Sequence, residues 1–267
     1  MMVEMGTDRI HHGFWRYFDT GHRLFEKGNK YENTMRDYYK LCDRLIGEVL
    51  EVIPEDAHVL VVSDHGAKRM HGAICVNEWL QQEGLLTLKE PPKEKGPLRL
   101  HMVDWDKTQV WAEGGYFARV FLNVKGREPQ GVVEPDRYEA TRDLLIEKLE
   151  GLGDENGNKI NTKAYRPEDL FRECNNIPPD LIVYFGDLDW RSAAQVGGGQ
   201  VHIFENDTGP DDANHDHQGI CILKSGRVPA DQKGSRVKEM NLLDVRPTVL
   251  DLFGLPAEES TNGKSLI

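Results

Sequence analysis

The sequence predicts an α/β fold, in which a sheet of mainly parallel strands is flanked by helices. Three observations predict it. Apolar residues recur three and four positions apart from Tyr31 to Ile53, which is typical of an amphipathic helix. The apolar run His58–Val62 follows, as in a strand buried on both faces of a parallel sheet. A polar turn, Ser63–Gly66, comes next, and helix, buried strand and turn is the usual order in α/β domains.

The remaining elements follow from similar patterns along the chain. We expect strands at Met1–Met5, Tyr116–Val124, Pro179–Phe185 and Gly219–Leu223, and helices at Val76–Leu85, Pro135–Gly151 and Asp244–Phe253. A charged Pro/Gly stretch, Pro91–Pro97, is typical of a linker. We therefore assign 1–96 and 179–267 to an α/β core and 97–178 to a small, cap-like α+β insertion. A first strand that begins at the first methionine suggests a truncated chain and an incomplete domain.

Composition excludes several classes of protein. The 267 residues contain 33 Lys and Arg against 45 Asp and Glu, which gives a net charge of −12. Such a chain binds nucleic-acid backbone poorly, because phosphate contacts need clustered cations. We also expect no membrane segment, because no apolar run approaches the roughly 18 residues that span a bilayer. The four cysteines are scattered without close pairs, and no signal peptide is visible, so a cytoplasmic location is predicted.

Three short polar clusters carry candidate chemistry, and each lies beside a predicted strand. They are Asp8-x-x-x-His12, the adjacent pair Asp64-His65, and His215-Asp216-His217. Carboxylate oxygen and neutral imidazole nitrogen are the usual ligands of zinc and manganese at catalytic sites. Any one cluster alone is better explained as polar surface in a loop. Together they could converge on two ions about 4 Å apart, the spacing that holds the attacking and leaving oxygens of a phosphoryl group.

Four motifs in this chain order resemble a known family. They are Asp8–His12, Val62–Gly66, His215-x-x-x-Gly219, and the ending Leu243–Pro256 followed by Asn262–Leu266. The chain resembles the C-terminal part of the alkaline phosphatase superfamily, and within it the type I phosphodiesterase/nucleotide pyrophosphatase branch. The resemblance covers both ends and the core, and leaves out 97–178.

The resemblance implies a site for two divalent ions, zinc or manganese. Asp8, His12 and His215 would hold one ion, and Asp64 and His65 would hold part of the other. The family also uses a Thr or Ser nucleophile and a further aspartate near the start of the enzyme. No segment here matches them, and Thr7 is expected to precede a ligand rather than to open a helix. The nucleophile is therefore unassigned, and we expect the chain alone to be inactive or weakly active.

The implied function is metal-dependent hydrolysis of a small-molecule phosphoric ester, either a phosphodiester or a nucleotide-like compound. Two alternatives stay open: a sulfatase or phosphomutase of the same superfamily, and a non-catalytic metal-binding fragment. The substrate, the metal and the oligomeric state are left open by the sequence.

Several neighbouring features have more than one interpretation. His11 and His217 could each exchange roles with an adjacent ligand, whereas His71 and His202 are better explained as surface loop residues. Gly197–Gly199 lacks the Gly-Lys-Ser/Thr ending of a phosphate loop. The tripeptide Asn206-Asp207-Thr208 matches the N-glycosylation pattern by chance.

Overall fold

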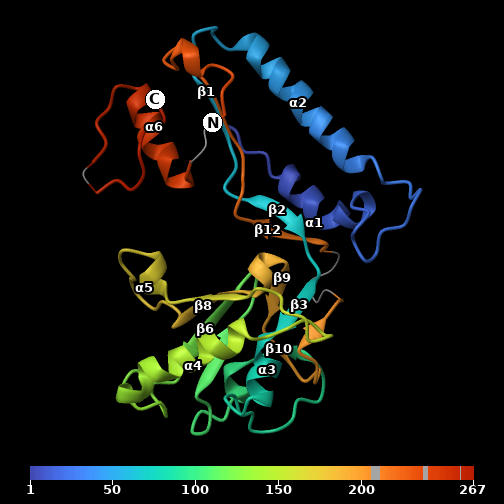
Figure 1. The fold of residues 1–267 in the computed structure, drawn as a ribbon, viewed down its shortest axis with the longest axis vertical. Coiled ribbons are helices and arrows are strands. Elements are labelled where there is room, and N and C mark those ends of the chain that lie inside the picture. The colour runs from blue at the N-terminus through green and yellow to red at the C-terminus, as the bar shows by residue number, and fades with distance from the viewer. Residues whose placement is uncertain (206–210, 237–239, 259) are drawn as a thin grey trace. The chain divides into compact units, whose positions relative to one another are not determined.

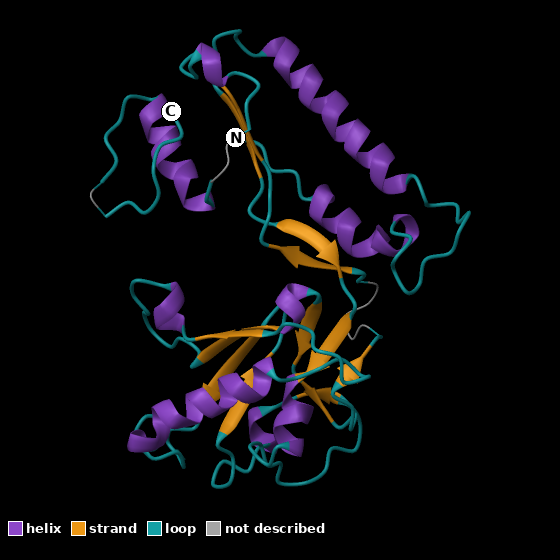
Figure 2. Cartoon of the chain, in the orientation of Figure 1, coloured by secondary structure: helices purple, strands orange, loops and turns teal. Residues whose placement is uncertain are grey.

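A computed structural model describes residues 1–205, 211–236, 240–258 and 260–267. The chain divides into two compact units (Figure 1). Unit 1 holds Met1–Met35 and Lys68–His215, and unit 2 holds Arg36–Ala67 and Asp216–Ile267. Both units contain helices and strands (Figure 2), so the predicted mixture of α and β structure is confirmed.

Unit 1 contains four helices and most of the strands among its described residues. The helices are α1 (Gly6–Phe18), α3 (Val76–Gln82), α4 (Tyr138–Glu150) and α5 (Pro167–Leu170). The strands are β3 (Gly72–Cys75), β4 (Gly96–Pro97), β5 (Val110–Glu113), β6 (Ala118–Leu122), β7 (Lys163–Tyr165), β8 (Leu181–Tyr184), β9 (Trp190–Ala193), β10 (Gln195–Val196) and β11 (His202–Ile203). Strands β2 (Gly66–Arg69) and β12 (Ala213–Asp216) pair with each other, and each begins or ends at the boundary between the units.

The core of unit 1 lies against a four-stranded antiparallel sheet with the strand order β5-β6-β8-β7. Alternate residues of β6 are buried, with Val120 and Leu122 completely inaccessible to solvent. Leu145 and Leu149, one helical turn apart on α4, join the same hydrophobic cluster. A second, three-stranded sheet has the order β11-β3-β9, in which β3 and β9 run parallel.

Each edge strand of the four-stranded sheet has a backbone N–H that is bonded by a helix side chain. On β5, the N–H of Ala112 donates to the amide oxygen of Asn77 from α3, at 3.0 Å. The same Asn77 amide donates back to the carbonyl of Ala112, at 2.9 Å. On β7, the N–H of Ala164 donates to the carboxylate of Glu150 from α4, at 3.3 Å. A buried and a half-buried helix side chain therefore each bond one residue of an edge strand, Ala112 on β5 and Ala164 on β7.

Unit 2 contains α2 (Thr34–Val52, whose first two residues belong to unit 1), β1 (Val59–Val62), β13 (Cys221–Lys224) and α6 (Val245–Leu252). Helix α6 ends at Leu252, and Gly254 shortly after it has a φ of +67°, as a glycine after a helix often does. The apolar stripe of α2 is not covered, because Leu45 and Val49 stay about two-fifths exposed. Among the described residues, the buried hydrophobic side chains all belong to unit 1.

Several predicted elements need correction. Met1–Met5 is not a strand, and the structure has helix α1 directly after it. Strand β1 is neither parallel nor buried on both faces. Within the described part of the chain it pairs with β13 alone, antiparallel, and its residues are half-buried or exposed. Strand β8 was expected in the core, yet it lies between β6 and β7 of the predicted insertion. The division at 97 and 178 itself stays a prediction.

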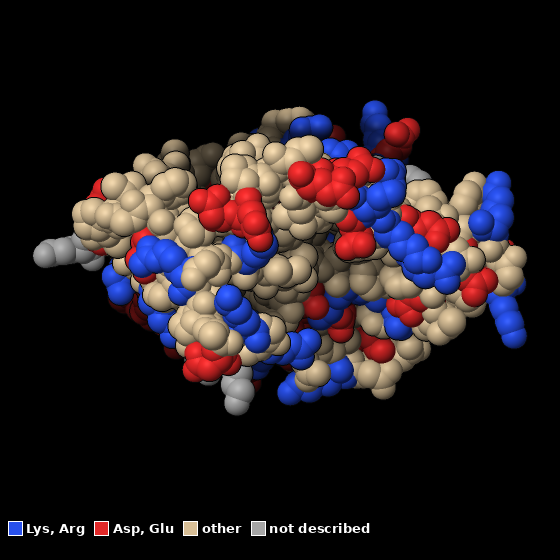
Figure 3. Space-filling view, turned by 90° about the horizontal axis from the view of Figure 1, so that it is seen from above, with Lys and Arg blue, Asp and Glu red and all other residues tan. Residues whose placement is uncertain are grey.

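Two further observations concern the surface and the described range. No helix in the described part of the chain has the length and apolar character needed to cross a membrane. Acidic and basic side chains lie interspersed on the face that Figure 3 shows, so the net charge of −12 is not gathered there into one patch. The tripeptide Asn206-Asp207-Thr208 lies outside the described residues.

Candidate metal centre

Helix α1 carries the first two candidate ligands. Asp8 lies in its first turn and His12 lies one turn further, so both side chains are on the same helical face. The Nε2 atom of His12 is 3.2 Å from Oδ1 of Asp8. The expected loop after a strand is therefore wrong, since the motif lies within a helix. Thr7 also lies in the first helical turn, contrary to expectation, and its hydroxyl donates to the carbonyl of Glu4.

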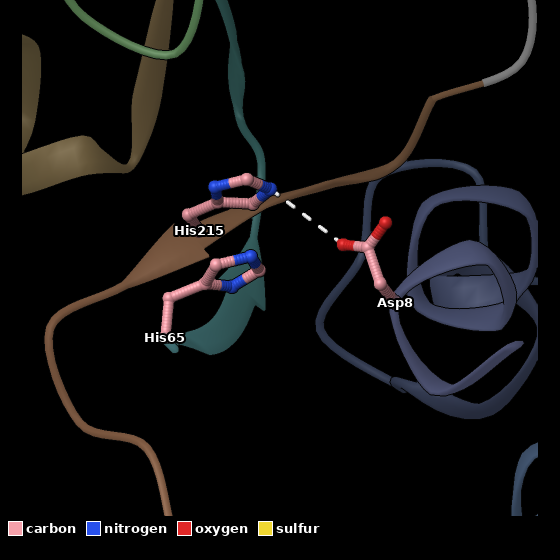
Figure 4. A group of neighbouring side chains, drawn as sticks. All are labelled: Asp8, His65 and His215. Atoms are coloured by element: carbon pink, nitrogen blue, oxygen red, sulfur yellow. Dashed lines mark ion pairs between the residues drawn. The ribbon is translucent and has the colours of Figure 1, made fainter. Parts of the chain in front are cut away.

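Strand β12 supplies the third candidate ligand, His215. Its Nε2 atom is 3.6 Å from the same Oδ1 of Asp8, as the dashed line in Figure 4 marks. The preceding residue, Asn214, is fully buried and donates to the carbonyl of Leu188 at 2.7 Å. The ring of Tyr116 stacks on the imidazole of His215, with 3.7 Å between the ring centroids. The side-chain hydrogen bond of the neighbouring Asn214 and the stacking of Tyr116 together restrict the orientation of His215.

The three side chains have the donor atoms that zinc or manganese takes. Two ligands bound tetrahedrally to one zinc ion at 2.0–2.1 Å lie about 3.4 Å from each other. The two distances from Asp8, 3.2 and 3.6 Å, are close to this value on either side. The rings of His12 and His215 are neighbours, 5.4 Å apart at their centroids. Because the side chains of Asp8, His12 and His215 are 36%, 16% and 23% exposed, an ion there could keep open positions for solvent or substrate. The distance from Asp8 to either histidine therefore fits a divalent ion.

The pKa of His12 is shifted by the charged groups around it. Its Nδ1 atom is 2.6 Å from a carboxylate oxygen of Asp211, and this hydrogen bond raises the pKa of His12 above its ordinary 6.5. Burial acts in the opposite direction, and the negative charges of Asp211 and Asp8 add to the increase. Burial raises the pKa of the Tyr116 hydroxyl as well, with further contributions from the same two carboxylates. Three acidic or phenolic groups thus surround the two imidazoles.

The second predicted cluster, Asp64 and His65, lies in unit 2. Asp64 and His65 follow β1, at the end of the strand where the sequence placed them. Nε2 of His65 is 3.7 Å from a carboxylate oxygen of Asp64, and Nδ1 lies 2.8 Å from the carbonyl of Gly66. The side chain of Asp64 is 83% exposed. Figure 4 also labels His65, and its proposed role stays a prediction.

Four other histidines that the sequence singled out, His11, His71, His202 and His217, lie in different surroundings. His11 has its ring 5.6 Å from that of Trp15, and His217 is exposed in unit 2. His71 stacks on Trp190, whereas His202 bonds the carbonyl of Gly153 at 2.8 Å. His71 is an exposed loop residue, as expected, whereas His202 lies half-buried in strand β11, so its interpretation as a surface loop residue is wrong.

Two residues near the site were missed by sequence reasoning. Asp211 bonds His12, and Tyr116 stacks on His215. Asp211 and Asp212 precede the His215 cluster in an acidic part of the chain, and Asp212 is buried. The ion pair between Asp212 and Arg16 could not be predicted from the sequence, because the two residues lie far apart along the chain.

The triple glycine has a structural role. The N–H groups of Gly198 and Gly199 donate to one carboxylate oxygen of Glu78, at 2.7 and 3.1 Å. Glu78 is buried on α3. Since these donors are taken by the protein itself, the loop does not offer them to a phosphate, in agreement with the sequence analysis.

A mixed α/β protein that groups one carboxylate with two imidazoles has the donor set of a metal-dependent hydrolase. Comparison with protein-family models matches residues 1–211 to the type I phosphodiesterase/nucleotide pyrophosphatase family, so the chain belongs to this hydrolase family. The match contains Asp8, His12, Asp64 and His65 and ends four residues before His215. No curated protein matches the chain.

Proposed function

We propose that this chain acts in metal-dependent hydrolysis of phosphoric esters, with a phosphodiester or nucleotide-like compound as substrate. Asp8, His12 and His215 hold one divalent ion, either zinc or manganese. One observation carries the proposal: a single carboxylate oxygen of Asp8 faces the Nε2 atoms of both histidines, at 3.2 and 3.6 Å. Membership of a phosphodiesterase family supports the reaction class.

The residues around this ion each have a distinct task. A bound divalent ion polarises a phosphoryl oxygen and lowers the pKa of its bound water. Asp8 supplies the negative charge that offsets part of the charge of the ion, and His12 and His215 bind it only when their Nε2 atoms are free of protons. A cation at this position also favours an anionic substrate, which the net charge of −12 would otherwise repel.

A second ion is proposed at Asp64 and His65, on the basis of the family resemblance. Two protein ligands leave a divalent ion largely hydrated, so we expect this site to bind much more weakly than the first. No nucleophile is assigned, and for this reason slow turnover is expected of the chain as given.

Metal titration tests the ligand assignment. Zinc and manganese are titrated into the wild type and into the His12→Ala and His215→Ala variants, with bound metal measured by calorimetry and elemental analysis. The wild type should show one tight site, and each variant should lose most of the metal. His101→Ala, which removes an exposed histidine of the same unit, serves as the control. Unchanged stoichiometry in both ligand variants would mean that the assignment is wrong.

Hydrolysis of model esters tests the substrate class. An activated aryl phosphodiester, the matching monoester and an aryl sulfate are compared with zinc or manganese added. We expect the diester to be hydrolysed fastest and the rate to fall in His12→Ala. Preference for the sulfate would instead support a sulfatase of the same superfamily.

A further inference from the structure

His12 is held between two carboxylates, one at each ring nitrogen. Its Nε2 atom faces Asp8, whereas its Nδ1 atom is 2.6 Å from Oδ1 of Asp211. We infer that Asp211 is a positioning residue: it accepts the Nδ1–H of His12 and so fixes the tautomer that leaves Nε2 available to a metal ion. The inference rests on the proposed ion site as far as metal affinity is concerned, and the tautomer can be measured without any ion.

The segment that carries Asp211 is fastened to α1 independently of this hydrogen bond. The backbone N–H of Asp212 donates to the carbonyl of His12 at 2.9 Å. Two nitrogens of Arg16, one helical turn beyond His12, donate to the two carboxylate oxygens of Asp212. Because Asp212 is buried, this paired contact holds the neighbouring Asp211 in register with the helix.

The geometry favours an indirect role for Asp211 over direct coordination. The two nitrogens of an imidazole ring point in widely different directions, so a carboxylate bonded to Nδ1 is on the opposite side of the ring from an ion at Nε2. A carboxylate at the second nitrogen fixes ring orientation and tautomer and makes the ligating nitrogen more basic. Removal of such a partner typically weakens metal binding about 10- to 100-fold. Asp211 is only 17% exposed, so water competes weakly for this hydrogen bond.

The first measurement uses the metal-free protein. Nitrogen–proton correlation spectra of ¹⁵N-histidine-labelled protein, recorded over a pH series and compared once the ring of His12 has become neutral, report its tautomer. We expect the Nδ1–H form in the wild type and the Nε2–H form, or a mixture, in Asp211→Ala. A purely structural role would leave the tautomer unchanged. An unchanged Nδ1–H form in Asp211→Ala would overturn the inference.

The second measurement is zinc affinity by calorimetry, with thermal unfolding of each variant recorded in parallel. Asp211→Ala should weaken binding about 10- to 100-fold, and Asp211→Asn, which keeps a hydrogen-bond acceptor, should restore part of the loss. Asp143→Ala, which removes an exposed carboxylate paired with Arg166, is the control and should bind as the wild type does.

Each outcome separates the inference from the proposed function. Complete loss of binding in both Asp211 variants would mean that Asp211 is itself a ligand, which overturns the positioning role. An unchanged zinc affinity in Asp211→Ala would also overturn it. If the wild type binds no zinc but the tautomer changes in Asp211→Ala, the proposed ion site fails while the positioning of His12 stands.

Discussion

Asp180 is the residue whose loss should destabilise unit 1 most clearly. Its carboxylate is 3% exposed and accepts four hydrogen bonds. One comes from the backbone N–H of Leu122 at 2.6 Å, two come from Arg127 at 2.7 Å each, and one comes from the hydroxyl of Tyr138 at 2.6 Å. Burial, together with the bond to Asp180, raises the pKa of Tyr138 to about 12.

The expected cost of Asp180→Ala follows from these partners. Leu122 is completely buried, so its N–H would be left without an acceptor at a cost of about 1 to 3 kcal/mol. The hydroxyl of Tyr138 is partly buried, and its lost bond is worth about 1 kcal/mol. Arg127 is 44% exposed and can return to water, so its ion pair adds only about 1 kcal/mol. We therefore expect the free energy of unfolding to fall by about 3 to 5 kcal/mol.

Urea denaturation followed by tryptophan fluorescence measures this change. All five tryptophans belong to unit 1, so the signal reports on that unit: Trp15, Trp79, Trp105, Trp111 and Trp190. Asp143→Ala, which removes an exposed carboxylate, should stay within about 0.5 kcal/mol of the wild type. A loss below about 1 kcal/mol in Asp180→Ala would contradict the reasoning, because the buried Leu122 donor would then have another partner.

Two further predictions concern His22 and Glu78. Burial lowers the pKa of His22 below its ordinary 6.5, and its Nδ1 accepts the N–H of Leu24 at 3.1 Å, so the folded state disfavours protonation. The free energy of unfolding should therefore fall as the pH decreases below 6.5. Urea titrations of the wild type and of His22→Gln at several pH values measure this, and the decrease should be smaller in His22→Gln. An identical pH dependence in both proteins would exclude the effect. Glu78→Ala should cost about 1 kcal/mol, since the N–H groups of the exposed Gly198 and Gly199 lose their acceptor and bond to water instead. Glu78→Gln, which keeps an amide oxygen, should cost less, and equal stability of all three proteins would show that the contact is unimportant.

The helices show which parts of the fold could be predicted. The stripe of α2 and the glycine after α6 are local signals, and both helices were located from them. Helix α1 was missed, although Ile10, Phe14 and Phe18 recur every four residues. The apolar residues of Met1–Met5 are also compatible with a strand, and the helical period begins only after them.

Strand β1 shows why tertiary pairing could not be predicted. An apolar run such as His58–Val62 is compatible with a buried parallel strand or with one strand of an antiparallel pair. Its partner, β13, lies far along the chain, and no local residue specifies the direction of pairing. At the proposed ion site, Asp8, His12 and His215 could be predicted because they belong to recognisable motifs, whereas contacts between distant segments could not. The contact of His12 with Asp211 forms only when distant segments meet.

The two helix side chains that bond the edges of the four-stranded sheet have a consequence for association between chains. An exposed edge strand offers its backbone to strands of other molecules, which leads to sheet extension and fibrils. Asn77 bonds both backbone groups of Ala112, as a neighbouring strand residue would, and Glu150 takes the N–H of Ala164. A strand from another molecule would have to displace these side chains at either edge before it could join. The sheet is thereby protected against edge-to-edge growth. Asn77→Ala should therefore increase aggregation at high concentration, in addition to the stability lost when the buried N–H of Ala112 has no acceptor.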